Sequence, residues 1–167
     1  MNTRQRHSGP SLYEKLLGNF QDGSSLHAWD ENSQHLFSVM DNIRVILNSR
    51  QGAIKHLPDY GLPDLAMIYR HLPASAHLLR QHIASTLLRY EPRLAHIDIQ
   101  LLANAQDDVL GYELICHLKQ SGLVRFGSYF TPDHAVRLQL LGAAEQKAPA
   151  RQATPQPSLA NRTPRST

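Results

Sequence analysis

The stretch Arg89-Tyr90-Glu91-Pro92-Arg93-Leu94 marks the point where the chain changes from a helix to a strand. Before this stretch, apolar residues recur at spacings of four, four and three, which places them on one face of a helix: Leu79, Ile83, Leu87 and Tyr90. Proline disfavours helical backbone at the residue before it, so a helix over 75–91, with Ser75 as its cap, is expected to end at Glu91.

After the proline, apolar and polar residues alternate, which is the period of a strand with one buried face. The same alternation predicts four strands, over 96–103, 110–119, 123–130 and 135–141. Helical spacing upstream predicts a helix from Leu36 to about Asn48 and a short helix over 65–72. Helices followed by an antiparallel meander predict an α+β fold, in which N-terminal helices pack on a mostly antiparallel four-stranded sheet.

In the helix that begins near Leu36, the apolar positions define a core-facing side. They are Leu36, Met40, Ile43, Ile46 and Leu47. The polar residues between them are expected largely on the opposite side: Asp41, Asn42, Arg44 and Asn48.

Residues 1–33 are predicted to form an N-terminal arm with one short helix. Ser11 is a natural N-cap, and Glu14 stands three residues later, which is the spacing of a capping box. A helix this short is marginal alone, so its apolar stripe should dock within the chain or on another subunit. That stripe consists of Leu12, Leu16 and Leu17.

The rest of the chain is predicted to form an α+β domain over 34–141 and a disordered basic tail over 142–167. The net charge of the chain is +3, but its positive charge is concentrated in the two ends, while the body 11–142 is net negative. A nucleic-acid-binding body is therefore not indicated. The basic tail offers a contact for an anionic lipid surface or a polyanion.

The single cysteine, Cys116, excludes an intrachain disulfide and is expected in the core. The first 20 residues hold no apolar segment of signal-peptide length, and no run approaches the roughly 18 apolar residues that indicate a membrane span. A cytoplasmic location is expected.

Few residues indicate chemistry. The ten histidines include no His-Glu-x-x-His spacing, and one cysteine excludes a thiolate zinc cluster, so neither a metal nor any cofactor is expected. Glu91 and Glu113 are the two carboxylates that could serve a glycoside hydrolase, which needs a pair roughly 5–10 Å apart. The chain offers no aromatic cluster to line a sugar-binding cleft.

Four motifs in series resemble one family. They are the segments Pro10-Ser11-Leu12-Tyr13-Glu14-Lys15-Leu16, Ile43-Arg44-Val45-Ile46-Leu47-Asn48-Ser49-Arg50, Tyr60-Gly61-Leu62-Pro63-Asp64 and Tyr90-Glu91-Pro92-Arg93-Leu94. In that order and spacing, over 11–141, the chain resembles TssE, the small baseplate subunit of type VI secretion, which is similar to a wedge protein of contractile-tailed phages.

The resemblance implies a structural role and no enzymatic activity. Such a subunit joins a baseplate wedge with TssF, TssG and TssK, contacts the sheath subunits TssB and TssC and the spike, and works in the cytoplasm at a baseplate docked on the inner-membrane complex. It also implies that an exposed sheet edge, with the hairpin 123–141 as the candidate, templates the sheath by strand pairing.

The resemblance also implies which residues meet partners. Glu91 and Arg93 are expected to pair with charges of a partner, held rigidly by Pro92, while Ser11, Leu12 and Leu16 are expected to dock a partner through the short helix. The remaining motif residues are expected to be mainly structural: Tyr60, Gly61, Leu62, Pro63 and Asp64, with Asn48 and Arg50.

A peptidoglycan hydrolase of the muramidase type is the alternative, because the family carries a lysozyme-like label. Against it, a carboxylate beside a guanidinium is driven toward its ionised form, which is the wrong direction for a general acid.

Overall fold

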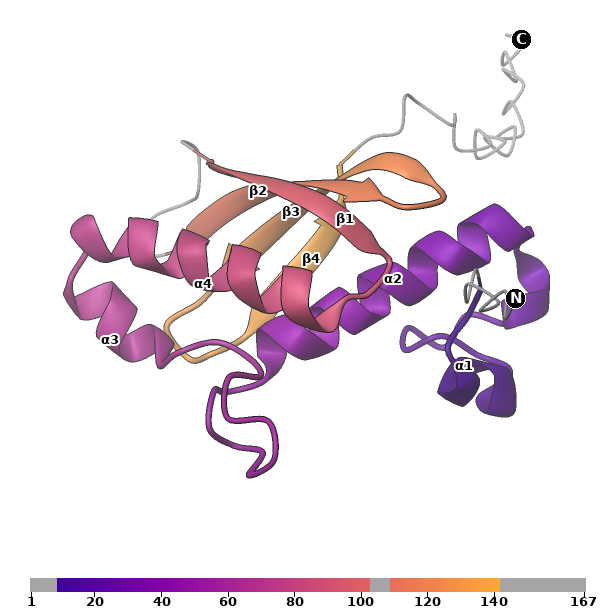
Figure 1. The fold of residues 1–167 in the computed structure, drawn as a ribbon, viewed down its shortest axis with the longest axis horizontal. Helices are drawn as coiled ribbons and strands as arrows, with labels where there is room; N and C mark the ends of the chain where they lie inside the picture. Colours follow the sequence, from indigo (N-terminus) through magenta and orange to yellow (C-terminus); the bar gives the residue numbers. More distant parts are fainter. Residues whose placement is uncertain (1–8, 103–108, 142–167) are drawn as a thin grey trace, which may run out of the picture.

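The computed structural model describes residues 9–102 and 109–141. Figure 1 shows the helices first in the chain and the strands last. The helices are α1 (Leu12–Leu17), the 3₁₀ turn η1 (Leu26–Ala28), α2 (Glu31–Asn48), α3 (Leu65–Arg70) and α4 (Ala74–Tyr90). The strands are β1 (Leu94–Leu101), β2 (Leu110–Leu118), β3 (Gly122–Phe130) and β4 (Val136–Leu140).

The strands form one antiparallel sheet in the order β1-β2-β3-β4, so β1 and β4 are its edges. Figure 1 shows the long helices α2 and α4 lying against one face of this sheet. Between the two layers lies a continuous apolar core that includes Ile43, Ile83, Leu114 and Phe126. The α+β expectation is confirmed, because helices with an apolar stripe and a sheet with one apolar face bury those surfaces together.

The expected change from helix to strand is present at Glu91-Pro92-Arg93, a segment that we call the corner. Glu91 caps α4, where its N–H donates to Leu87, and β1 begins at Leu94, two residues earlier than expected. The strand starts earlier because Leu94 is buried in the core and pairs with Leu118 of β2. The helix before the corner is capped by Pro73 rather than Ser75, whose buried hydroxyl donates to the Ile68 carbonyl.

One polar residue of α2 lies where periodicity did not place it. Asp41 was expected on the open side of the helix but is buried, because the loop after α1 packs on that side. Its carboxylate accepts from the Gln21 N–H at 2.9 Å and pairs with Arg44 at 2.8 Å. In the same loop Phe20 and Leu26 are buried, so apolar side chains attach this loop to the body.

The segment Tyr60–Asp64 is a structural turn against the end of α2. Gly61 adopts a φ of +91°, and a Cβ there would lie 2.6 Å from the carbonyl carbon of Ser49 and closer still to its oxygen. The Leu62 N–H donates to that same carbonyl at 2.8 Å. Asp64 caps α3 and also pairs with Arg50 at 2.9 Å and with His134. The backbone of Gly61 and Leu62 and the side chain of Asp64 therefore tie this turn to the neighbouring elements.

We predict that Gly61→Ala lowers the free energy of unfolding by about 2–4 kcal/mol, because the new methyl group must displace backbone. Gly52→Ala is the matched control, since Gly52 has a φ of +81° but open space around its Cβ position. It should cost only about 1–2 kcal/mol, the penalty for left-handed backbone. Urea unfolding measures both, and equal losses for the two variants would contradict this role of the close approach.

Candidate functional site

The carboxylate of Glu91 is fully buried, and partners within the chain hold both of its oxygens. Arg93 grips it with two side-chain bonds, Nε to Oε1 at 2.8 Å and a terminal nitrogen to Oε2 at 2.9 Å. The Arg93 N–H adds a third bond at 2.9 Å, and the amide of Asn42 donates to Oε2 at 2.8 Å. Burial alone would raise the pKa of Glu91, but the Arg93 bonds and charge and the Asn42 bond hold it below its usual value.

The same guanidinium fastens the corner to α2. Arg93 donates to the hydroxyl of Ser38 at 2.8 Å and to its carbonyl at 3.2 Å. On the other side, the Lys119 N–H donates to the Arg93 carbonyl at 2.9 Å, and its ammonium group donates to the Pro92 carbonyl at 2.5 Å. The corner therefore joins α2, α4 and the β2–β3 turn into one rigid unit.

The short helix α1 is attached to this unit by polar contacts. The predicted capping box is present, with the Ser11 N–H donating to the Glu14 carboxylate at 2.6 Å and the Ser11 hydroxyl accepting from the Glu14 N–H. The Ser11 N–H also lies 3.3 Å from the Ser38 hydroxyl, which Arg93 contacts as well.

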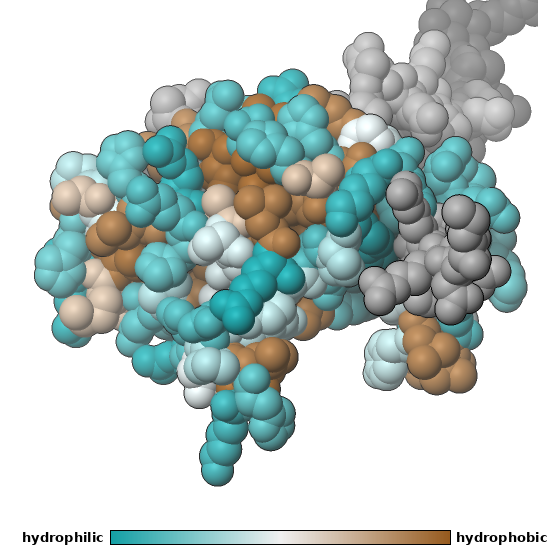
Figure 2. Space-filling model, viewed as in Figure 1, coloured by the Kyte–Doolittle hydropathy of each residue, from teal (hydrophilic) through white to brown (hydrophobic). Residues whose placement is uncertain are grey.

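The apolar side of α1 is open. Leu12 is 74% exposed and Leu16 is 75% exposed, and Tyr13 and Leu17 are exposed beside them. Figure 2 shows the apolar side chains gathered over α1 at the lower right. This helix therefore contacts α2 through its N-cap Ser11, and the described residues leave its leucines uncovered.

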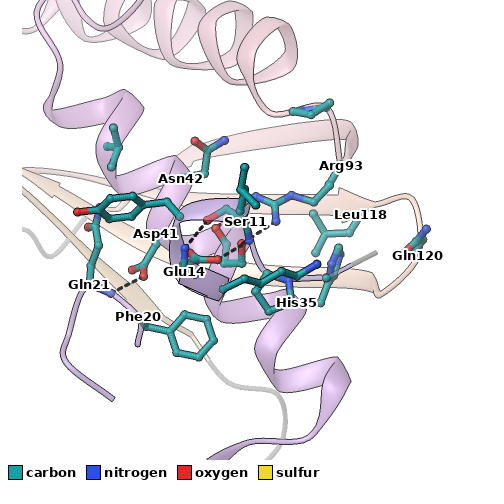
Figure 3. A pocket seen from close by; sticks show the side chains of 18 of the residues that line it. Ser11, Glu14, Phe20, Gln21, His35, Asp41, Asn42, Arg93, Leu118 and Gln120 are labelled. Carbon is teal, nitrogen blue, oxygen red and sulfur yellow. Dashed lines mark hydrogen bonds between the residues drawn. The ribbon is translucent and has the colours of Figure 1, made fainter. Parts of the chain in front are cut away.

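A groove of about 1640 Å³ lies between α1, one side of α2 and the corner. Figure 3 shows Ser11, Glu14, His35 and Arg93 gathered around it. Its apolar lining includes Leu12, Leu17, Phe20, Val45, Pro92 and Leu118. Its charged lining consists of Lys15, Arg93 and Lys119 with Glu14 and Asp41. We call this feature the corner groove.

The structure thus brings the predicted residues Ser11, Leu12, Pro92 and Arg93 together at the corner groove. The second predicted set lies elsewhere: Asn48, Arg50 and Tyr60–Asp64 surround the far end of α2. A contact of Glu91 or Arg93 with a partner stays a prediction. Sequence reasoning missed Ser38 and His35, and it placed Asn42 on the solvent side, because no local pattern indicates a partner 49 residues away.

The buried pair determines what a charge reversal at Arg93 would test. Arg93→Glu would set a second carboxylate against buried Glu91. An uncompensated buried charge is strongly destabilising, so that variant would report on folding rather than on assembly.

Among residues 9–102 and 109–141, no group of three His, Cys, Asp or Glu side chains is arranged to hold a metal ion. A search of the same residues finds no helix with the length and apolar character needed to cross a membrane.

We predict that Glu91→Gln lowers the free energy of unfolding at pH 7 by about 3 kcal/mol, because Arg93 loses its ionic partner. Since the folded-state pKa of Glu91 lies below its ordinary 4.5, this stabilisation is present above that value and is lost as the pH falls through the folded pKa. The gap between wild type and Glu91→Gln should therefore shrink in acid.

The exposed Arg89–Asp59 pair provides the control. At pH 7, Asp59→Asn should cost under about 1 kcal/mol in the same urea titrations. A gap between wild type and Glu91→Gln that stayed constant from neutral to acid pH would contradict the assigned ionised pair.

Comparisons with known proteins agree with the motifs. The family model described as "Baseplate wedge protein gp25" matches residues 33–121. A solved structure described as "The baseplate complex from the type VI secretion system" contains a similar chain, with 30% identity and a TM-score of 0.50, covering 68% of this chain and 98% of that chain. No curated protein matches. The chain therefore belongs to the gp25 family of baseplate wedge proteins and is a TssE-like member of it.

Proposed function

We propose that this chain is a structural subunit that joins the type VI baseplate wedge through the corner groove and α1, and that it has no catalytic role. One observation carries the proposal: the leucines of α1 are exposed beside a groove whose polar groups are already organised. Monomeric proteins rarely leave large apolar patches open, and such patches commonly mark binding sites. TssF, TssG and TssK are the proposed partners, at a baseplate on the cytoplasmic side of the inner-membrane complex.

The state of Glu91 supports a non-enzymatic role over a muramidase. A general acid needs a carboxyl group that is protonated near neutral pH and is open to substrate. Glu91 is fully buried and has a lowered pKa, and Glu113 is nearly buried and paired with Arg125.

We further propose that the β4 edge of the sheet connects to the sheath. In an antiparallel pair the main-chain bonds alternate along the strand. The Leu141 N–H donates to the Arg125 carbonyl in β3, so the N–H groups of Leu138 and Leu140 point away from β3. At the start of β4, Asn48 bonds both main-chain groups of Val136 at 3.0 and 3.2 Å.

Among the described residues, that arrangement leaves a short free edge of defined extent. The side chain of Asn48 already bonds the outward main-chain groups of Val136. The outward main-chain groups of Leu138 and Leu140 are then available to a strand from another chain. Strand addition at such an edge gains main-chain hydrogen bonds, which is the physical basis of templating a sheath subunit.

We predict that the double variant Leu12→Ser with Leu16→Ser reduces recovery of co-expressed TssF, TssG and TssK by about tenfold or more, because apolar anchors dominate binding energy. Stability should change by no more than about 0.5 kcal/mol, since both side chains are exposed. Leu78→Ser on α4, where Leu78 is 55% exposed, is the control and should retain the partners. Recovery equal to wild type for the double variant would remove α1 from the interface.

We predict that Leu140→Pro blocks sheath assembly while leaving wedge capture unchanged. Proline removes the outward N–H of residue 140 and leaves the β3 pairing of β4 in place. Leu140→Ala keeps that N–H and is the matched control. The measurement is the frequency at which labelled sheath subunits form sheaths in cells. Sheaths that grow at the wild-type frequency with Leu140→Pro would contradict templating at this edge.

A further inference from the structure

His35 has no hydrogen-bond partner for either ring nitrogen among the described residues. It lies in the first half of α2, lines the corner groove and is only 4% exposed. Buried polar side chains in folded proteins almost always have a partner, and an orphaned one carries a desolvation cost. The imidazole therefore has an unused donor and an unused acceptor, both buried at the edge of the groove.

The groups around His35 are engaged elsewhere. At the corner, Glu91 is held by Arg93 and Asn42, and Arg93 is held by Glu91 and Ser38. On α1, one oxygen of Glu14 accepts from the Ser11 N–H. None of these groups bonds His35, so we expect its hydrogen-bond partner to come from outside the described chain.

The corner side of the groove offers one unbalanced cation. Arg93 is balanced by Glu91, but Lys119 takes part in no ion pair among the described residues, and its ammonium group has donors beyond its bond to the Pro92 carbonyl. The basic tail of this chain, with Lys147, Arg151, Arg162 and Arg165 against Glu145, has the wrong sign to balance that cation. A carboxylate on a segment of another protein has the right sign.

We propose that the wedge partner places an Asp or Glu side chain in the corner groove, where its carboxylate accepts a hydrogen bond from His35, while apolar residues of the same segment cover Leu12 and Leu17. This inference rests on the proposed function, because it names the chemistry of the partner at that site. His35 is a binding residue that the motifs do not include.

A dependence on pH follows. In the free chain, burial and the charge of Arg93 hold the pKa of His35 below its usual 6.5, although Glu91 acts in the opposite direction. A partner carboxylate favours the charged imidazole, so the complex should bind protons that the free chain does not. Affinity should then rise as the pH falls from about 8 to about 6.

The test uses the full chain and a co-purified TssF–TssG complex as the probe. His35→Phe keeps the ring size and removes both nitrogens, and His35→Gln keeps donor and acceptor but cannot titrate. We expect His35→Phe to raise the melting temperature of the free chain, because an unsatisfied polar group is gone, and to weaken binding about tenfold or more. His35→Gln should lose the pH dependence and the proton uptake that calorimetry in two buffers measures.

The outcomes separate the two claims. If wild type does not bind the probe at all, the proposed function fails and the inference fails with it. If wild type binds and His35→Phe binds equally well, or if proton uptake is the same for wild type and His35→Gln, the inference is overturned and the proposed function stands. A rise in stability together with a loss of binding for His35→Phe supports the inference, since a residue with only a packing role would not separate them.

Discussion

The buried ion pair between Glu91 and Arg93 is the constraint on which the rest of this structure depends. A carboxylate without solvent must be matched by charge and hydrogen bonds, and Arg93 supplies three of the bonds at this corner. The same guanidinium reaches Ser38, to which α1 is also attached. One pair of side chains thereby fixes the end of α4, the start of β1, the position of α2 and the place of the N-terminal helix.

Helix α2 connects two surfaces with different physical character. In its middle, Ser38 and Asn42 support the corner groove, which combines open apolar surface with charged side chains. At its end, Asn48 closes the first position of the β4 edge. The groove therefore runs along one side of α2 and the sheet edge lies at its end, as the proposed wedge and sheath contacts require.

Much of the fold could be predicted from sequence because the deciding signals are local. Pro92 ends α4 at Glu91, Ser11 and Glu14 form their capping box, and alternation identifies the four strands. Three features could not be read from the local pattern. Asp41 is buried by a loop that folds back, and Asn42 meets a residue 49 positions away. Glu91 pairs with Arg93 only two residues later, but its burial depends on the packing of the whole corner.

Four of the predicted partner-binding residues lie together in the fold, but the contacts among them were not predicted. Ser11, Leu12, Pro92 and Arg93 line one groove, and a partner contact there stays a prediction. Opposite charges two residues apart could serve a partner or each other, and only the burial of Glu91 decides how they are used in the free chain. His35 could not be found from the sequence, since one histidine among ten carries no distinguishing spacing.

A high-resolution structure of the assembled wedge containing this chain would test the central claim most directly. The account predicts that the Glu91 carboxylate stays on Arg93 and Asn42 as in the free chain, with a partner segment seated in the corner groove against Leu12 and Leu17. A wedge in which Arg93 has left Glu91 to grip a partner carboxylate, with the groove empty, would contradict it.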